Sequence, residues 1–147
     1  MQSVPNTFKI VPYGTSHYEA AVELRTEILR KPLGLCFSQE YLEKEKGYIH
    51  FVGLKNDEVV AAASLVPEQF TCKMRQVAVR ADMQGLGIGS GLIDYCEAYA
   101  KAQKFQSLYC HTREPAVPFY TKKGYLYEGE YFMEIGIPHI KMIKELG

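Results

Sequence analysis

Three glycines at every second position, Gly85, Gly87 and Gly89, lie between a strand-like segment and a helical pattern. The stretch reads RQVAVRADMQGLGIGSGL, from Arg75 to Leu92. Glycine adopts backbone conformations closed to other residues and lets main-chain N–H groups approach a ligand. Amides at the start of a helix also carry the positive end of the helix dipole. The spacing therefore predicts a loop that binds an anionic group.

Two common phosphate-binding loops do not fit these residues. A P-loop needs Lys and then Ser or Thr, but Gly89 is followed by Ser90 and another glycine. The dinucleotide pattern G-x-G-x-x-G needs a glycine where Ser90 or Leu92 stands, and an acid about 20 residues on, where Lys104 lies. Both loops are therefore disfavoured.

A third loop pattern, Q-x-x-G-x-G, matches Gln84, Gly87 and Gly89. Successive inward-pointing amides of residues 84–90 would hold a pyrophosphate beside the helix start. An ordinary glycine-rich turn is the alternative, but such turns seldom need alternating glycines directly before a helix. The pattern therefore favours a pyrophosphate-binding loop.

Composition restricts the partners of this chain. Its 147 residues suit one domain, and 17 Lys and Arg balance 17 Asp and Glu. This balance argues against nucleic acid or an anionic membrane as a bulk partner, so any basic site must be local. No apolar run approaches the ~20 residues of a membrane span, and the first residues lack a secretory-signal pattern. We therefore expect a cytoplasmic protein.

The four cysteines, Cys36, Cys72, Cys96 and Cys110, are well separated and form no C-x-x-C pair. This spacing argues against a zinc site, and no metal is expected. Two disulfides are one alternative. Free core thiols are favoured, because the cysteines lie within apolar segments.

The elements that must position these residues are visible as changes of hydrophobic period. Strand and helix patterns alternate in the order β-α-α-β-β-β-α-β-α-β-β. We expect an α/β fold with a mixed sheet, antiparallel hairpins early and a βαβ crossover at the glycine loop. The predicted strands are residues 7–11, 48–54, 59–66, 72–79, 107–110, 127–135 and 139–143, and helices are predicted after Ser16, at 38–47, behind the glycine loop and at Pro115.

Two motifs give the chain a resemblance to the GNAT family of N-acetyltransferases. They are VAVRADMQGLGIG, Val77–Gly89, and PAVPFYTKKGY, Pro115–Tyr125, which matches A-x-x-F-Y-x-x-x-G-[FY]. The segments RTEILRKPLGL and FMEIGIPHIKM resemble the small bacterial branch that includes the ElaA proteins. The resemblance implies a GNAT fold: a mostly antiparallel twisted sheet of six to seven strands, about four helices and a splayed parallel strand pair.

The resemblance implies acetyl-CoA as the donor substrate. It would lie where residues 75–79 and 107–110 splay apart, with the pantetheine amides on the backbone of Val77, Ala78 and Val79. The amides implied for the pyrophosphate belong to Gln84, Gly85, Leu86, Gly87, Ile88, Gly89 and Ser90.

Tyr120 matches the catalytic tyrosine of the family, whose hydroxyl serves the departing CoA thiolate. The alternative is a helix tyrosine that packs on the sheet. Many members place a glutamate on the strand before the loop, and this chain has none there. Glu134 and His139 are the candidate bases, and His111 is a third that could also line the acceptor site. Surface or hydrogen-bonding roles are the alternatives.

Two arginines of the first predicted helix are further candidates for the acceptor site. Arg25 and Arg30 could bind an anionic part of the acceptor. Solvated positions on the helix are the alternative for both.

The resemblance implies an N-acetyltransferase that acts on a small primary amine by direct attack in a ternary complex. Cys110 is discounted as a covalent nucleophile because only the neighbouring His111 could activate it. A non-catalytic acyl-CoA sensor or partner-binding module is one alternative, and acetylation of a protein or peptide amine is another. A homodimer formed through the last strands is common in the family.

Overall fold

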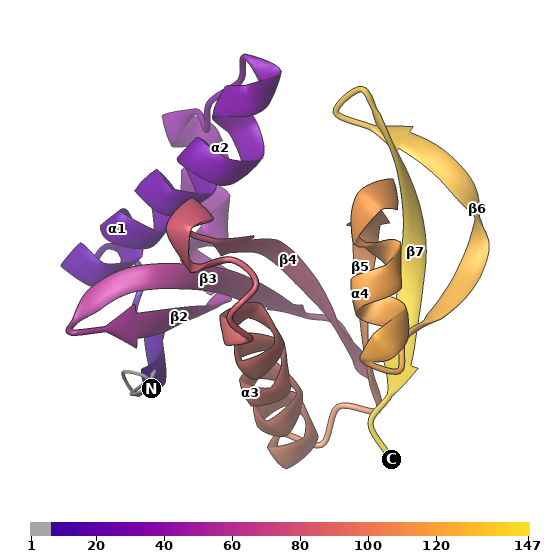
Figure 1. Cartoon of the computed structure of the whole chain (residues 1–147). Coiled ribbons are helices and arrows are strands. Elements are labelled where there is room, and N and C mark those ends of the chain that lie inside the picture. The colour runs from indigo at the N-terminus through magenta and orange to yellow at the C-terminus, as the bar shows by residue number, and fades with distance from the viewer. Residues whose placement is uncertain (1–6) are drawn as a thin grey trace.

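The computed structural model describes residues 7–147, and in this range it has a seven-stranded sheet in the order β1-β2-β3-β4-β5-β7-β6 (Figure 1). Neighbouring strands are antiparallel, except that β4 and β5 run parallel. The expected mixed, mostly antiparallel sheet is confirmed. The strands are β1 Thr7–Val11, β2 Ile49–Lys55, β3 Glu58–Pro67, β4 Thr71–Val79, β5 Ser107–Arg113, β6 Leu126–Glu134 and β7 Ile137–Glu145.

Within the described residues, four α-helices occupy the four places where the sequence predicts them. Thr15, rather than Ser16, caps the first helix, because its hydroxyl accepts a hydrogen bond from Tyr18 N. The first helix continues into a π-helical turn, Thr26–Arg30, and the chain turns at Gly34, whose φ is 72°. The helices are α1 Ser16–Arg25, α2 Gln39–Glu43, α3 Ile88–Ala102 and α4 Val117–Lys122.

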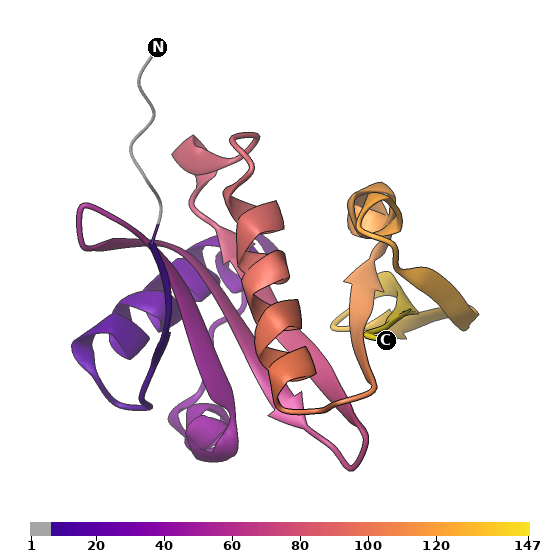
Figure 2. The same ribbon diagram turned by 90° about the horizontal axis from the view of Figure 1, so that it is seen from below.

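Helices cover both faces of the sheet (Figure 1 and Figure 2). On one face, Tyr18, Ala21 and Leu24 of α1 form an apolar cluster with β2 and β3. On the other face, α3 and α4 share a larger cluster, which includes Leu92 and Tyr120. The two clusters fix both helix layers against the strands that carry the site.

The β4–β5 pair comes apart halfway along its length. Residues 71–74 pair with 107–110, and beyond them β4 pairs only with β3 and β5 only with β7. At this point Gln76 and Val77 of β4 face a single residue of β3, and Gln76 has a φ of 57°. Such a bulge bends its strand and increases the local twist. The bulge therefore directs β4 away from β5, and the expected splay is confirmed.

The cysteines are free thiols, and three of them are buried: Cys72, Cys96 and Cys110. The prediction of a core thiol is wrong for Cys36, which is exposed in the loop before α2. In residues 7–147 no helix has the length and apolar character that a membrane crossing requires.

Candidate active site

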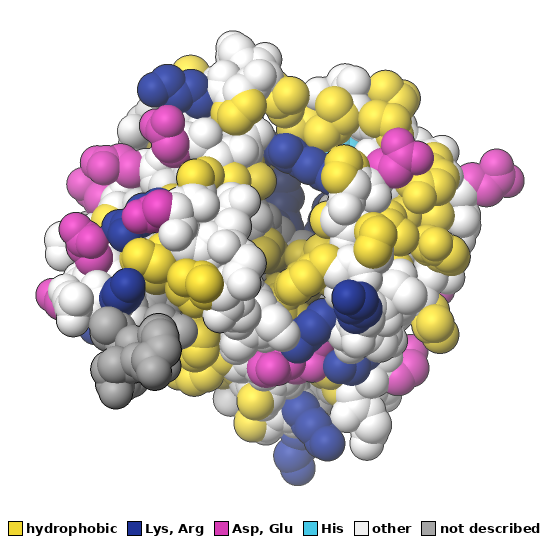
Figure 3. Space-filling view, viewed as in Figure 1, with side chains coloured by type: hydrophobic (Ala, Val, Ile, Leu, Met, Phe, Trp, Pro, Cys, Tyr) yellow, Lys and Arg dark blue, Asp and Glu magenta, His cyan; other side chains and the backbone are white. Residues whose placement is uncertain are grey.

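Two cavities meet where β4 and β5 separate. The loop cavity, about 540 Å³, lies against the glycine loop, and the basic cavity, about 220 Å³, lies between β4 and β5. They share Val77, Ala116 and Tyr120 as wall residues. Figure 3 shows the surface hollowed between the two halves of the molecule, with Lys and Arg side chains in its upper part. A ligand that passes from one cavity to the other would pass Tyr120.

The loop explains why its glycines come at every second position. Gly85, Gly87 and Gly89 all line the loop cavity. The residues between them do not: Leu86 is 65% exposed and Ile88 is buried in the core. Gly85 and Gly87 also have φ values of 81° and 84°, which disfavour other residues. Between residues 85 and 89, the positions that face the cavity are therefore those without side chains.

Main-chain donors are available at this loop. The first hydrogen bond within α3 runs from Gly91 N to Gly87 O at 3.0 Å, so the amides of residues 88–90 have no partner inside the helix. The Gln84 side chain donates to Val79 O at 3.0 Å and ties the loop to the end of β4. Free amides and the helix dipole together suit an anion.

Two glycines of α3 do different work. A Cβ at Gly89 would lie 3.3 Å from Val79 Cγ2 and 4.0 Å from Phe119 Cζ, in the wall of the loop cavity. A Cβ at Gly91 would lie 2.9 Å from Phe8 Cζ, which is closer than real contacts allow. Gly89 therefore keeps the cavity open, whereas Gly91 lets α3 pack against β1.

Val77, Ala78 and Val79 at the end of β4 line the loop cavity. On one side, Ala78 and Val79 pair with β3, and on the other side the parallel partner has already diverged. An extended ligand that carries amides can hydrogen-bond to such a strand edge. The placement suits the pantetheine-like contact expected from the sequence.

Tyr120 is buried, with 7% of its surface exposed, yet its ring contacts both cavities. Its ring packs edge-on against Phe119 and Tyr125. Among residues 7–147 no group hydrogen-bonds to its hydroxyl, and this oxygen is not sealed from solvent. Burial, with a smaller contribution from Cys110, raises the pKa of Tyr120 well above 10. The phenol therefore keeps its proton and has it free to donate.

The structure brings Glu134, His139 and His111 together on the wall of the basic cavity. His111 Nδ1 lies 2.9 Å from Glu134 Oε1, and His139 Nε2 lies 3.9 Å from Glu134 Oε2. Phe132 packs against both imidazole rings. Pairing of β7 with both β5 and β6 produces this cluster, since it aligns residues from three strands.

The hydrogen bonds distinguish the two histidines. An ionised carboxylate only accepts, so His111 donates from Nδ1, and in the neutral tautomer this leaves Nε2 as an acceptor. His139 is 3% exposed and donates from Nδ1 to Ile137 O at 2.9 Å. Burial disfavours the charged form of Glu134, but the His111 hydrogen bond and nearby positive charges outweigh it and lower its pKa. Glu134 therefore stays ionised and orients His111.

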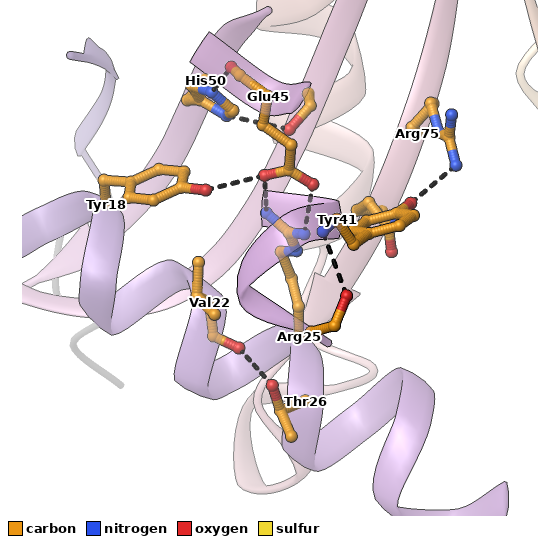
Figure 4. A network of polar contacts seen from close by, with 11 residues as sticks. Tyr18, Val22, Arg25, Thr26, Tyr41, Glu45, His50 and Arg75 are labelled. Atoms are coloured by element: carbon orange, nitrogen blue, oxygen red, sulfur yellow. Dashed lines mark hydrogen bonds and ion pairs between the residues drawn. The ribbon is translucent and has the colours of Figure 1, made fainter. Parts of the chain in front are cut away.

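Arg25 was expected beside the acceptor, but it lies away from both cavities. Its guanidinium donates to both carboxylate oxygens of Glu45, at 2.9 and 2.6 Å, and only 1% of its surface is exposed (Figure 4). Tyr18 donates to the same carboxylate at 2.9 Å, and His50 contacts the Glu45 carbonyl. This network anchors α1 to the chain before β2, so Arg25 has a structural role. Arg30, one turn later, lines the basic cavity instead.

Residues that the sequence did not single out complete both cavities. The alternation of polar residues along β4 is the one signal that marks Lys73 and Arg75 as neighbours on one side of the strand. The π-helical turn contributes to both cavities, as such turns often do at functional sites. The additional wall residues include Ile28, Met83 and Phe119 in the loop cavity and Leu29, Lys73, Arg75 and Arg113 in the basic cavity.

Comparison with known proteins gives concordant results. A model of the Acetyltransferase (GNAT) family matches residues 18–125. A Bacillus subtilis (strain 168) protein named as a "putative acetyltransferase" is 27% identical over 128 residues, 85% of this chain and 87% of that protein.

Two crystal structures of similar fold extend the comparison. Escherichia coli ElaA has a TM-score of 0.80 at 21% identity, covering 96% of this chain and 100% of that one. A GNAT family acetyltransferase from Elizabethkingia anophelis with acetyl-CoA bound has a TM-score of 0.74 at 21% identity, covering 95% and 97%.

Proposed function

Since this chain belongs to the acetyltransferase (GNAT) family, we propose that it transfers the acetyl group of acetyl-CoA to a primary amine of a small molecule. The amine attacks the thioester directly, with both substrates bound. The observation that carries the proposal is the position of Tyr120 at the junction of a loop cavity and a basic cavity. A group there touches both reactants.

Acetyl-CoA would occupy the loop cavity. The residues present fit it, because unpaired amides of residues 88–90 face the expected pyrophosphate and the glycines leave room for it. The pantetheine arm would run along Val77–Val79, whose free strand edge matches its amides. This direction of binding leads the thioester toward Tyr120.

The amine would approach from the basic cavity. Its nitrogen attacks the thioester carbon, the carbon–sulfur bond breaks, and the thiolate takes the Tyr120 hydroxyl proton or a hydrogen bond from it. The amine must be neutral to attack, and an alkyl ammonium has a pKa near 10. His111 Nε2, whose ring is oriented by Glu134, would accept the proton that the amine loses.

Direct attack is favoured over a covalent enzyme intermediate. Cys110 is the thiol that lines the basic cavity in the described part of the chain. Burial raises its pKa to about 11, so it stays a neutral thiol at physiological pH. Its sulfur lies 3.1 Å from the Thr112 hydroxyl rather than beside a base. A thiol in this state is a poor nucleophile.

The first test is a thermal-shift titration with acetyl-CoA, with ATP and NADH as controls. A ligand at 100 times its Kd adds about 2.7 kcal/mol, which should raise Tm by several degrees. Thiol release is then measured with a panel of amines and peptides. Stabilisation by acetyl-CoA alone together with amine-dependent thiol release would support the proposal. Stabilisation without transfer to any amine would favour the sensor, and transfer to peptides alone would exclude a small-molecule acceptor.

A further inference from the structure

We infer that the acceptor is a small amine that also carries an anionic group, a carboxylate or a phosphate, bound by the cations of the basic cavity. The inference rests on the proposed function, because it names the substrate class of the same site. It comes from four cationic side chains that line this cavity together with a single carboxylate, that of Glu134. These cations are Arg30, Lys73, Arg75 and Arg113.

The four cations have no carboxylate partner in the described part of the chain. Within residues 7–147, no carboxylate lies within ion-pair distance of any of them, whereas Arg25, Arg80 and Lys144 are all paired. The whole chain has equal numbers of acidic and basic residues. A local excess of unpaired positive charge is therefore a property of this cavity, and it suits an anion from outside.

The guanidinium groups converge from opposite walls. Arg113 of β5 donates to Leu29 O at 3.0 Å, and Arg30 donates to the same carbonyl at 3.4 Å. A carbonyl carries no formal charge, so the two groups meet uncompensated, and each keeps other N–H donors free. Burial, and repulsion between the two arginines, lowers the pKa of Arg113. A bound carboxylate or phosphate would relieve this repulsion and could bridge both groups.

The hydroxyl of Tyr41 in α2 positions one of these cations. It accepts a hydrogen bond from Arg75 Nη2 at 2.7 Å (Figure 4) and another from Gln76 Nε2 at 2.8 Å. Tyr41 itself does not line the basic cavity, whereas Arg75 and Gln76 do. A neutral hydroxyl holds the Arg75 guanidinium without neutralising its charge, so other N–H donors of this group remain for an oxygen anion.

The phosphates of acetyl-CoA do not account for these cations. The glycine loop lines the other cavity, and Tyr120 lies between the two. A pyrophosphate on the loop amides is therefore on the far side of the reacting thioester. The positive cavity has an effect on the amine as well, because like charges disfavour an ammonium ion and lower its pKa. An anionic group on the acceptor would secure binding while the amine becomes neutral.

The test compares acceptors that differ only in their anion. Thiol release from acetyl-CoA is measured for β-alanine against β-alaninamide and for phosphoethanolamine against ethanolamine, as kcat/KM at constant ionic strength. We expect the anionic member of at least one pair to be preferred by tenfold or more. The pair that shows the preference distinguishes a carboxylate from a phosphate.

Variants then connect the preference to the cavity. Lys73→Gln and Arg113→Gln should each reduce the preference at least tenfold, mainly through the KM of the acceptor, with the KM of acetyl-CoA unchanged. Lys101→Gln, on the exposed surface of α3, is the matched control and should keep it. Loss of folding alone would lower both members of a pair equally and leave their ratio unchanged.

The possible failures are distinguishable. Turnover of the neutral members at equal or higher kcat/KM, or a preference that survives in both cavity variants, would overturn the anionic acceptor and leave the acetyltransferase intact. Absence of thiol release with every member, in a protein that acetyl-CoA still stabilises, would overturn the proposed function and the inference with it.

Discussion

The Tyr120 hydroxyl can be removed without removing any hydrogen bond within residues 7–147. Within residues 7–147 it has no hydrogen-bond partner, and its ring packs against Phe119 and Tyr125. Tyr120→Phe keeps the ring and deletes only the proton donor. We therefore expect Tm and the stabilisation by acetyl-CoA to stay unchanged while kcat falls.

The size of the fall follows from the charge on the leaving group. A hydrogen bond to a charged group contributes about 1.5–3 kcal/mol. The Tyr120 hydroxyl would make such a bond to the CoA thiolate as the negative charge on sulfur develops. Applied to the transition state, that amount corresponds to a loss of about 10- to 150-fold in kcat. The pKa of Tyr120 is raised by burial, so the donor stays protonated across the physiological range. The effect should therefore change little between pH 6 and 9.

Tyr125 offers a matched control in the same cluster. Its hydroxyl donates to Glu97 Oε2 at 2.8 Å, and it does not line either cavity. Because its partner is a charged carboxylate, Tyr125→Phe should cost about 1.5–3 kcal/mol of stability, a fall in Tm of roughly 3–12 °C, with kcat retained. Steady-state thiol release and thermal denaturation of both variants measure the four quantities.

Two results would refute this reasoning. If Tyr120→Phe kept full kcat under conditions where chemistry limits turnover, the hydroxyl would have no part in thiolate departure. If it lowered Tm by several degrees, the hydroxyl would be held by a partner in solution and would not be free at the junction of the cavities.

Three further outcomes follow from the contacts. Gly89→Ala should weaken acetyl-CoA binding, while the stability of the free protein is kept or raised by up to ~1 kcal/mol. Gly91→Ala should instead lower stability by about 1–3 kcal/mol, because the added methyl group overpacks the contact with Phe8. Equal effects of the two variants on binding and on Tm would contradict the different roles of the two glycines. Arg25→Gln leaves Glu45 buried without its ion pair and should cost about 3–5 kcal/mol with acceptor KM unchanged; a raised KM in a stable variant would return Arg25 to the substrate site. Burial lowers the pKa of His50 below 6.5, so the unfolded state binds the proton more readily and stability should fall as pH drops from 6.5, by at most about 1.4 kcal/mol per pH unit. Denaturation at pH 7.5 to 5.5 checks this, and His50→Gln should flatten the profile.

The glycine loop was predictable because the residues that define it are close together in the sequence. The period of Gly85, Gly87 and Gly89 and the helix start behind them lie within a few residues of one another. Backbone geometry alone then decides which positions face the loop cavity. The motif around Tyr120 is equally short. The order of helices and strands along the chain followed from alternating patterns, and the parallel pair from the crossover rule, which need little more than sequence neighbours.

The acceptor side depends on contacts between distant parts of the chain. Arg25 and Arg30 are equivalent as residues on a helical pattern, and the sequence alone does not separate them. Glu45, 20 residues away along the chain, forms an ion pair with Arg25, whereas Arg30 at the end of the π-helical turn lines the basic cavity. A contact between distant parts of the chain therefore decides which arginine is structural.

The sequence by itself determined the family, the pattern of strands along the chain, and the positions of the glycine loop and Tyr120. Each of these depends on the spacing of residues that lie close together in the chain. The tertiary structure alone decided how the two cavities meet and which charges lie unpaired between them. Residues 30, 73, 75 and 113 come from three separate elements, and only the splay of β4 from β5 brings them around one space. Electrostatic interaction depends on distance in space rather than along the chain, so a chain with no net charge still builds a strongly positive site.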